Sequence, residues 1–250
     1  MQDASKPDVS LFIPVYRDER TVADLVARAL RLLEEVAARY EIIVVDDGSP
    51  DASGRIADEL AARHACVRVA HHPENLGYGA AFKTGLAMSA YEWICMVDGD
   101  NEYDVYDLKR MLMLRNYYPL VIAFRYRKLH STARVFVSYV YNALLRFLFR
   151  TRFRDISTGI RVIHRSVLDE VTICSNSPFV GAELAIKAML RGFPVGEVGI
   201  QTFPRKFGTG SVLTFANVLK TMRDLLRMRR EVFSELYLLP EGRERGGRAE

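Results

Sequence analysis

Short runs of apolar residues alternate, in about the first hundred residues, with longer segments whose apolar residues recur every three or four positions. Such runs are typical of buried strands, and the longer segments are typical of amphipathic helices. Strands joined by single helices require right-handed crossovers, so this order predicts an α/β fold with a mostly parallel sheet flanked by helices. The predicted strands are Val9–Ile13, Glu41–Val45, Val67–Ala70 and Trp93–Val97, and the predicted helices between them are Thr21–Ala38, Asp51–His64 and Ala80–Ser89.

The second half of the chain has a further predicted strand, Leu120–Phe124, and two apolar helical stretches. The first stretch, Val135–Phe149, is interrupted by Arg146 and falls short of the roughly twenty apolar residues that a membrane-spanning helix needs. Its flanking arginines suit a helix lying in an anionic lipid interface, and the alternative is a buried crossover helix. The second stretch, Leu213–Leu239, has an apolar stripe among basic residues, which fits core packing, self-association or membrane contact.

Two carboxylates directly follow the apolar run Trp93–Val97. Asp98 and Asp100 would point to the same side of an extended chain, and Gly99 between them would let a ligand approach closely. Mg²⁺ and Mn²⁺ are typically held by one or two carboxylates together with substrate phosphate oxygens. The pattern predicts a metal site for a nucleotide diphosphate, although this run taken alone also fits an ordinary turn.

The other predicted strands of the first half also end in acidic, Gly or Pro residues. Pro14–Glu19 follows the first strand, Asp46–Asp51 the second and Asn75–Gly79 the third. Each loop alone fits turn chemistry and a helix N-cap. Because the ligand crevice of such a sheet lies beyond the carboxyl ends of its strands, we expect these loops to converge with Asp98 and Asp100.

The charge of the chain is unevenly distributed. Its 250 residues are 49% hydrophobic, enough for a substantial core, and carry a net charge of +4. Between Arg125 and Arg165, however, ten Lys or Arg stand against one acid, Asp155, which implies an anionic partner for this segment. Three cysteines without CxxC spacing indicate a reducing compartment, and the polar stretch Met1–Asp8 lacks the apolar part of a signal peptide.

Four motifs occur in a fixed order: Ile13-Pro14-Val15-Tyr16 with Glu19, Asp46-Asp47-Gly48-Ser49, Asn75 with Gly77 and Gly79, and Asp98 with Asp100. Together they resemble the family 2 glycosyltransferases of the GT-A fold. The resemblance implies a nucleotide-diphosphate sugar as donor, UDP- or GDP-linked, and Mg²⁺ or Mn²⁺ as cofactor. The residues implied to bind the nucleotide sugar are Pro14, Tyr16, Glu19, Asp46, Asp47, Gly77, Lys83 and Asp98. Those implied to hold the metal are Asp98, Asp100 and Glu102, although several members carry Gln at the last position.

Further motifs follow in the second half: Arg125-Tyr126-Arg127, Ser157-Thr158-Gly159-Ile160-Arg161, Gly181-Ala182-Glu183, and Pro204-Arg205 with Gly208, Gly210 and Ser211. This order resembles the polyprenyl-phosphate glycosyltransferases, the dolichol-phosphate mannose synthase group, over roughly Val9–Leu226. The chain departs from the pattern at Val212, where many members carry Lys. The residues implied to bind phosphate are Arg125, Arg134, Arg161, Arg205 and Ser211, and those implied to take part in catalysis are Asp100, Arg205 and Glu183.

We therefore expect a metal-dependent, inverting glycosyltransferase that moves a sugar to a polyprenyl phosphate. A phosphate acceptor is already anionic at neutral pH and needs no strong base. If the acceptor is instead a saccharide hydroxyl, Glu183 is the first candidate for the base and Asp155 the second. A nucleotide-sugar-binding module and a nucleotidyltransferase are further alternatives, but the latter would carry a Gly-rich phosphate loop where this chain has Pro14-Val15-Tyr16.

We expect a single catalytic domain, cytoplasmic and peripheral at the inner face of a membrane. The expected partners are the nucleotide sugar, the polyprenyl phosphate and an anionic membrane surface. A membrane-spanning partner or a homo-oligomer is a further option, and no nucleic acid is expected. The expected boundaries are 1–8 for a polar tail, 9–104 for the nucleotide-sugar-binding half, 105–211 for the acceptor-binding half, 212–239 for an amphipathic helix (one domain over 9–239), and 240–250 for a disordered tail.

Overall fold

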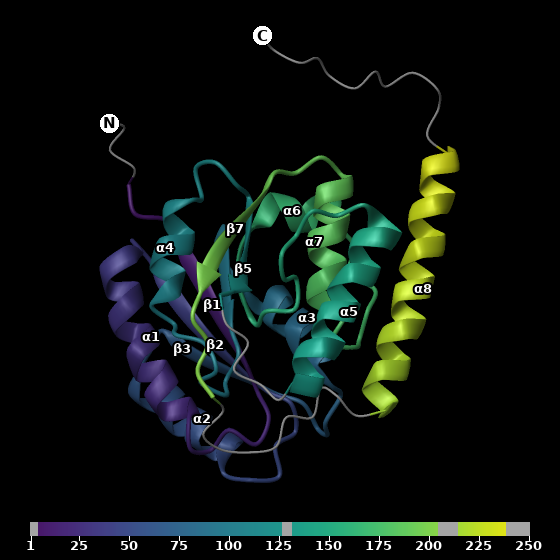
Figure 1. The fold of residues 1–250 in the computed structure, drawn as a ribbon. Helices are drawn as coiled ribbons and strands as arrows, with labels where there is room; N and C mark the ends of the chain where they lie inside the picture. Colours follow the sequence, from purple (N-terminus) through teal and green to yellow (C-terminus); the bar gives the residue numbers. More distant parts are fainter. Residues whose placement is uncertain (1–4, 127–131, 205–214, 239–250) are drawn as a thin grey trace.

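The computed structural model describes residues 5–126, 132–204 and 215–238. Seven strands of this part of the chain form one sheet, in the order β3-β2-β1-β4-β6-β5-β7. Strand β6 runs antiparallel to both of its neighbours, and all other neighbouring pairs are parallel. The predicted α/β class with a mostly parallel sheet is therefore confirmed (Figure 1).

The strands and helices predicted in the first half are all present, with ends within two residues of the prediction. The predicted tail over 240–250 lies outside the described residues. The strands are β1 (Val9–Val15), β2 (Tyr40–Asp46), β3 (Val67–His71), β4 (Trp93–Val97), β5 (Leu120–Arg125), β6 (Ile160–His164) and β7 (Val195–Ile200). The helices are α1 (Val22–Val36), α2 (Ser53–Arg63), α3 (Tyr78–Met88), α4 (Asp107–Met113), α5 (Thr132–Phe149), α6 (Arg165–Glu170), α7 (Val180–Leu190) and α8 (Phe215–Leu238).

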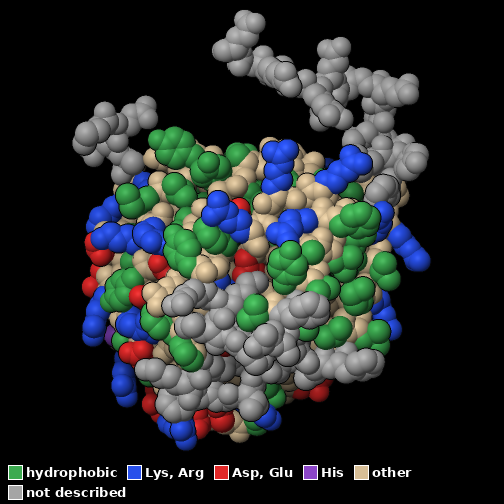
Figure 2. Space-filling model, in the orientation of Figure 1, with side chains coloured by type: hydrophobic (Ala, Val, Ile, Leu, Met, Phe, Trp, Pro, Cys, Tyr) green, Lys and Arg blue, Asp and Glu red, His purple; other side chains and the backbone are tan. Residues whose placement is uncertain are grey.

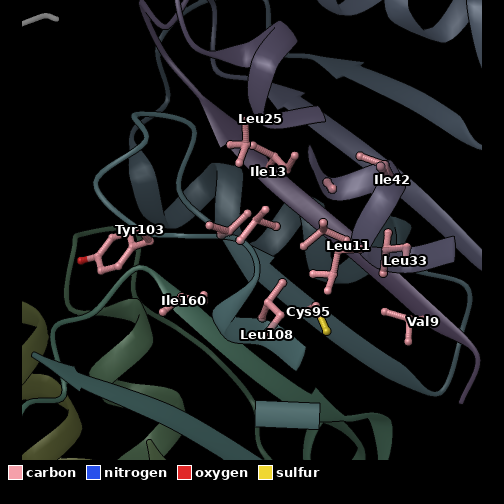
Figure 3. Packing of buried hydrophobic residues seen from close by; sticks show 14 of the residues in the cluster. Val9, Leu11, Ile13, Leu25, Leu33, Ile42, Cys95, Tyr103, Leu108 and Ile160 are labelled. Carbon is pink, nitrogen blue, oxygen red and sulfur yellow. The ribbon is translucent and has the colours of Figure 1, made fainter. Parts of the chain in front are cut away.

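Alternation along the strands sends side chains into two apolar layers. From β1, Leu11 and Ile13 enter one layer and Phe12 enters the other. Helices α1, α2 and α4 cover the first layer, and α3, α5, α7 and α8 cover the second (Figure 1). Figure 3 shows the first layer, where Leu25 and Leu33 of α1 lie over β1. Since each fully buried side chain of this size contributes about 1.5–3 kcal/mol, the two layers hold the strands and the loops that follow them in place.

Helix α5 divides its apolar residues between the core and the surface. Leu145 and Phe149 are buried in the second layer, whereas Tyr139 and Phe147 are 65% and 82% exposed. One face of α5 therefore packs as a crossover helix would, while its other face presents apolar side chains to the outside. Within the described ranges, no helix is both long enough and apolar enough to cross a membrane.

Helix α8 also exposes apolar side chains, and basic residues lie between them. Leu225 and Met228 are buried against the second layer, so the helix is attached to the body along one stripe. On the right of Figure 2, where α5 and α8 lie, apolar and basic side chains are intermixed. The exposed apolar residues of α8 are Val218, Leu219, Met222 and Leu226, and its exposed basic residues are Lys220, Arg223, Arg227 and Arg230.

Candidate active site

Asp98 directly follows β4, and neighbours on two other segments fix it. Its N–H donates to the carbonyl of Gly159 (2.9 Å), and its Oδ1 accepts from the Tyr78 hydroxyl (3.0 Å). Its Oδ2 lies so close to Gly159 that a Cβ at that glycine would be 1.6 Å away. Burial and the negative charges of Asp100 and Glu102 raise the pKa of the Asp98 carboxyl well above its usual range. The end of β4 thus gathers three acids, and burial there disfavours the charged form of Asp98.

The loop after Asp98 turns sharply and carries the two further acids. Asn101 has a left-handed backbone (φ 58°), which Asn adopts more readily than most residues. Arg28 of α1 donates to its side-chain oxygen (2.5 Å) and so ties the loop to α1. The Oδ1 of Asp100 accepts from the N–H of Glu102 (2.9 Å), and both acids are 9% exposed. The turn is therefore rigidly held, with its carboxylates largely inside the protein.

Gly99 joins this loop to the loop after β1. Its N–H donates to the carbonyl of Pro14 (3.2 Å), and its own carbonyl accepts from the Thr21 hydroxyl (2.7 Å). A Cβ at Gly99 would lie 2.9 Å from the Pro14 carbonyl oxygen, so only glycine fits without movement. Pro14, predicted to bind the nucleotide sugar, thus contacts the acidic loop through its backbone.

Hydrogen bonds also connect the loops after β1 and β2. Glu19 accepts from a backbone N–H of the second loop (3.1 Å), and the N–H of Arg17 donates to the Ser49 hydroxyl (3.2 Å). Tyr16 is half-buried beneath the Arg17 guanidinium, which lies 5.2 Å from the ring centroid. Lys83 lies in the middle of α3 and is partly exposed. Tyr16 and Glu19 therefore stand at the same edge of the sheet as Asp98, as predicted from the strand order.

Asp46 and Asp47, at the end of β2, are each paired with a histidine. The Oδ2 of Asp46 lies 3.0 Å from Nδ1 of His71, and the Oδ1 of Asp47 lies 2.6 Å from Nδ1 of His72. Asp47 also accepts from the N–H groups of Gly77 and of the residue before it (2.9 Å each). The carboxylate of Asp47 thus shapes the turn that begins α3.

Arg125 and Asp155 form a buried, two-point ion pair. The Nε–Oδ2 and Nη2–Oδ1 distances are 2.7 and 3.2 Å, and the side chains are 9% and 2% exposed. Although burial opposes it, the hydrogen bond to Asp155 raises the pKa of Arg125. Asn142 of α5 accepts from the N–H of Ile156 (3.1 Å), which fixes this segment to α5. The predicted phosphate ligand and the second candidate base are thus partners of each other.

Arg161 of β6 is 2% exposed, and its guanidinium holds backbone carbonyls. Its Nη1 donates to Gly181 (2.8 Å), and its Nη2 donates to Ile156 and Thr158 (2.9 and 3.0 Å). Its Nε is a buried nitrogen with no hydrogen-bond partner among the described residues. Arg161 was predicted to bind phosphate, and its described contacts instead fix the chain segment that precedes β6.

Glu183 of α7 is 2% exposed and uses both of its carboxylate oxygens. Oε1 accepts from the N–H of Cys174 (3.1 Å) and Oε2 from the N–H of Ser175 (2.8 Å), while the Lys187 ammonium lies 2.9 Å from Oε1. Lys187 also pairs with Glu231 of α8 (2.7 Å). These contacts favour a structural role for Glu183 and not the predicted role of a base. Lys187 therefore already supplies a cation to Glu183 and Glu231.

Three predicted phosphate ligands cannot be located. Arg205 and Ser211 lie outside the described residues, and Arg134 belongs to α5 but its side chain is not described. The described chain does approach the acidic loop just before Arg205, because the N–H of Phe203 donates to the carbonyl of Glu102 (2.9 Å).

The carboxylates after β4 suit a divalent cation that substrate oxygens help to hold. Within the part of the chain that the structure describes, three potential ligand atoms lie within 4.8 Å of one another only in the group formed by Cys174, Glu183 and Glu231. Asp98, Asp100 and Glu102 therefore do not form a closed cage. Mg²⁺ is usually held by one or two carboxylates with phosphate oxygens completing its shell, so the hard oxygen donors of these residues fit such an ion.

Reasoning from the sequence missed two residues that contact Asp98. Tyr78 is half-buried at the first position of α3, and Gly159 immediately precedes β6. The glycines of the Asn75–Gly79 motif indicated a functional turn here, but nothing in the sequence assigned a role to the tyrosine between them. Gly159 was quoted only as part of a motif.

Comparison with known proteins identifies the family of this chain. The family model described as "Glycosyl transferase family 2" matches residues 10–172. Polyprenol monophosphomannose synthase of Mycolicibacterium smegmatis is 30% identical over 225 residues, covering 85% of this chain and 83% of the relative. Glycosyltransferase AglD of Haloferax volcanii is 27% identical over 217 residues, and the match spans 81% of this chain but 34% of AglD. Dodecaprenyl-phosphate galacturonate synthase of Rhizobium johnstonii is 25% identical over 230 residues, covering 89% of this chain and 68% of the relative.

Among solved structures, glucosyl-3-phosphoglycerate synthase from Mycobacterium tuberculosis in complex with Mn²⁺, UDP and phosphoglyceric acid has a TM-score of 0.65. The match is 18% identical and covers 92% of this chain and 77% of that one. At this identity the likeness shows the fold, and the predicted GT-A class is confirmed.

Proposed function

The chain belongs to glycosyl transferase family 2 and is a glycosyltransferase, and on this premise we propose that it transfers a sugar from a nucleotide-diphosphate sugar to a polyprenyl phosphate. One observation carries the proposal: the 30% identity to polyprenol monophosphomannose synthase extends over 83% of that protein. A second relative is named for a different sugar on the same class of lipid, dodecaprenyl phosphate. The shared feature of the two names is the acceptor, so the proposal specifies the acceptor and not the sugar.

The donor would bind across the carboxyl ends of β1, β2 and β4. The joined loops around Tyr16, Asp47 and Gly77 supply a preformed edge for the nucleotide, and UDP is the nucleotide in the structural relative. Asp98 and Asp100, with Glu102 beside them, would hold Mg²⁺ or Mn²⁺ against the diphosphate. When bound, the ion supplies charge stabilisation for the leaving diphosphate.

The acceptor phosphate needs no general base. This agrees with the contacts of the two candidate bases, Glu183 and Asp155, which are both already bonded within the protein. Glu183 is bonded to two backbone N–H groups and to Lys187, and Asp155 is paired with Arg125. Neither carboxylate is poised to deprotonate a hydroxyl. The phosphate oxygen would attack the anomeric carbon from the face opposite the diphosphate, which inverts the configuration. Arg205 and Arg134 are proposed to position the phosphates, because guanidinium groups bind phosphate at two points.

We also propose that the enzyme acts at the cytoplasmic face of a membrane, where its lipid acceptor resides. The exposed apolar residues of α8 lie among Lys and Arg. Two acids of the helix are paired, Asp224 with Arg227 and Glu231 with Lys187. An anionic lipid surface matches both the apolar and the basic side chains.

A donor screen tests the function directly. The protein is incubated with Mn²⁺, a panel of radiolabelled UDP- and GDP-sugars, and undecaprenyl or dolichyl phosphate, and label is followed into the organic phase. One donor should label the lipid, and Asp100→Asn should abolish transfer while Asp169→Asn, the same change at an exposed position of α6, should not. Transfer to a saccharide hydroxyl but to no lipid phosphate would contradict the proposal.

A further inference from the structure

The carboxylate of Asp98 is held from two sides by residues that the proposed mechanism does not use. On one side the Tyr78 hydroxyl donates to Oδ1 (3.0 Å). On the other side Oδ2 lies against Gly159, where a Cβ would be 1.6 Å from it. The Asp98 N–H, bonded to the Gly159 carbonyl, fixes the backbone as well (2.9 Å). Rotation of the carboxylate is therefore restricted in both directions.

Tyr78 is itself held rigidly. As the first residue of α3, it follows Gly77, whose N–H is bonded to Asp47 (2.9 Å). Its ring lies 6.5 Å from that of Phe82, and its hydroxyl also approaches the sulfur of Met96 (4.0 Å). Since a ring packed in this way has few other rotamers, its hydroxyl stays directed at Asp98.

The position of Gly159 is also fixed, because Arg161 binds the segment that precedes it. The Arg161 guanidinium donates to the carbonyls of Ile156 and Thr158 in the segment before Gly159, and to Gly181 at the start of α7. A Cβ at Gly181 would lie 2.3 Å from Nη2, so the guanidinium is closely packed there. The segment before β6 cannot move away from Asp98 without breaking these buried bonds.

We propose that Tyr78 is a positioning residue for the donor, because it fixes the direction of the Asp98 carboxylate, and that Arg161 supports the same carboxylate from the other side through Gly159. This inference rests on the proposed function, in which Asp98 meets the donor diphosphate and its cation. A carboxylate that is already aligned loses less conformational freedom on binding, so the alignment favours binding of the donor.

Tyr78→Phe removes the hydroxyl and keeps the ring. Loss of one hydrogen bond to a charged group should weaken binding of Mn²⁺ with UDP about ten- to a hundredfold. The KM for the nucleotide sugar should rise by a similar factor, while kcat changes by less than about threefold, because the alignment serves bound substrate and transition state alike. Gly159→Ala perturbs the same carboxylate from the opposite side, since the added Cβ must displace Oδ2. It should weaken binding of Mn²⁺ with UDP at least as much.

The matched control is Tyr40→Phe, which removes the hydroxyl of a half-buried tyrosine at the start of β2, the end of that strand away from Asp98. Binding is measured by the electron paramagnetic resonance signal of free Mn²⁺ in the presence of UDP, and folding by thermal unfolding of each variant. A merely structural role for Tyr78 would lower the melting temperature and leave Mn²⁺·UDP affinity within twofold of the wild type, which would overturn the proposal. If Tyr78→Phe does not fold, Gly159→Ala decides by the same criterion. A wild-type protein that does not bind Mn²⁺ with UDP would instead overturn the proposed function, and this inference with it.

Discussion

Replacing Glu183 by Gln distinguishes a phosphate acceptor from a hydroxyl acceptor. Replacement of a general base would show a loss of activity, whereas the contacts of this carboxylate predict a loss of stability. Its two oxygens receive backbone N–H groups from Cys174 and Ser175, and its charge pairs with Lys187 at 2.9 Å. Glutamine keeps one acceptor oxygen, but its NH₂ group would face a backbone N–H that also donates. Lys187 retains the carbonyl of Thr172 and Glu231 as partners.

The expected cost follows from these contacts. A hydrogen bond to a charged group contributes about 1.5–3 kcal/mol, and one such bond and the ion pair are lost while another bond is weakened. We therefore expect the free energy of unfolding to fall by about 2–4 kcal/mol, which corresponds to a fall of roughly 4–16 °C in melting temperature for a chain of this size. A phosphate acceptor has no proton that Glu183 would need to remove, so kcat/KM should fall by less than about threefold.

Urea unfolding gives the stability, and initial rates with the donor and lipid found in the screen give kcat/KM. Glu170→Gln provides the control, since Glu170 lies exposed at the end of α6. A loss in kcat/KM of a hundredfold or more with unchanged stability is the signature of a general base. That result would refute the structural assignment of Glu183 and favour a hydroxyl acceptor.

Three further predictions address other parts of the molecule. Arg205→Ala should lower kcat/KM about ten- to a hundredfold, because a charge-assisted contact to phosphate is lost. This fall in kcat/KM should be larger than that of any variant at Glu183. The protein should float with anionic liposomes at low salt and be released by high salt. Leu219→Glu on α8 (52% exposed) should weaken flotation, whereas Met113→Glu on α4 (68% exposed) should not, and equal effects would argue against docking through α8. Asp58, followed by Asp46, raises the pKa of His71 above its ordinary value of 6.5, so its protonated form stabilises the fold at low pH and this contribution is lost as pH rises through the raised pKa. Urea unfolding should thus show stability falling as the pH rises above about 6.5, and the fall should be smaller in His71→Gln.

Hydrophobic periodicity was sufficient to predict the elements of the first half, because their apolar faces are buried on both sides of the sheet. The strand Trp93–Val97 has the predicted ends, but β1 continues past the predicted end at Ile13 to Val15. Pro14 has no N–H to donate to a neighbouring strand. It is tolerated because it pairs with Val45 of β2 in register while its carbonyl accepts from Gly99 of the adjacent loop.

Pairings between distant residues could not be predicted in the same way. Arg125 stands in a basic segment and was expected to face an anionic ligand, yet it is bonded to Asp155, the single acid of that segment. The charge count contained both residues, but only the fold brings β5 to the segment before β6. The same holds for Asp47 and His72, which meet because β2 and β3 are neighbouring parallel strands.

The antiparallel strand β6 explains why the support of Asp98 was not foreseen. Parallel strands bring their carboxyl ends to one edge, and that rule identified the loops after β1 to β4. Because β6 runs the other way beside β4, pairing Val97 with Ile160, it is the start of β6 that lies at this edge. Gly159 therefore reaches Asp98 from a segment that the rule excludes. The antiparallel strand thus brings Gly159 against Asp98 at the proposed donor site, and the buried Arg161 of β6 holds the segment before Gly159 in place.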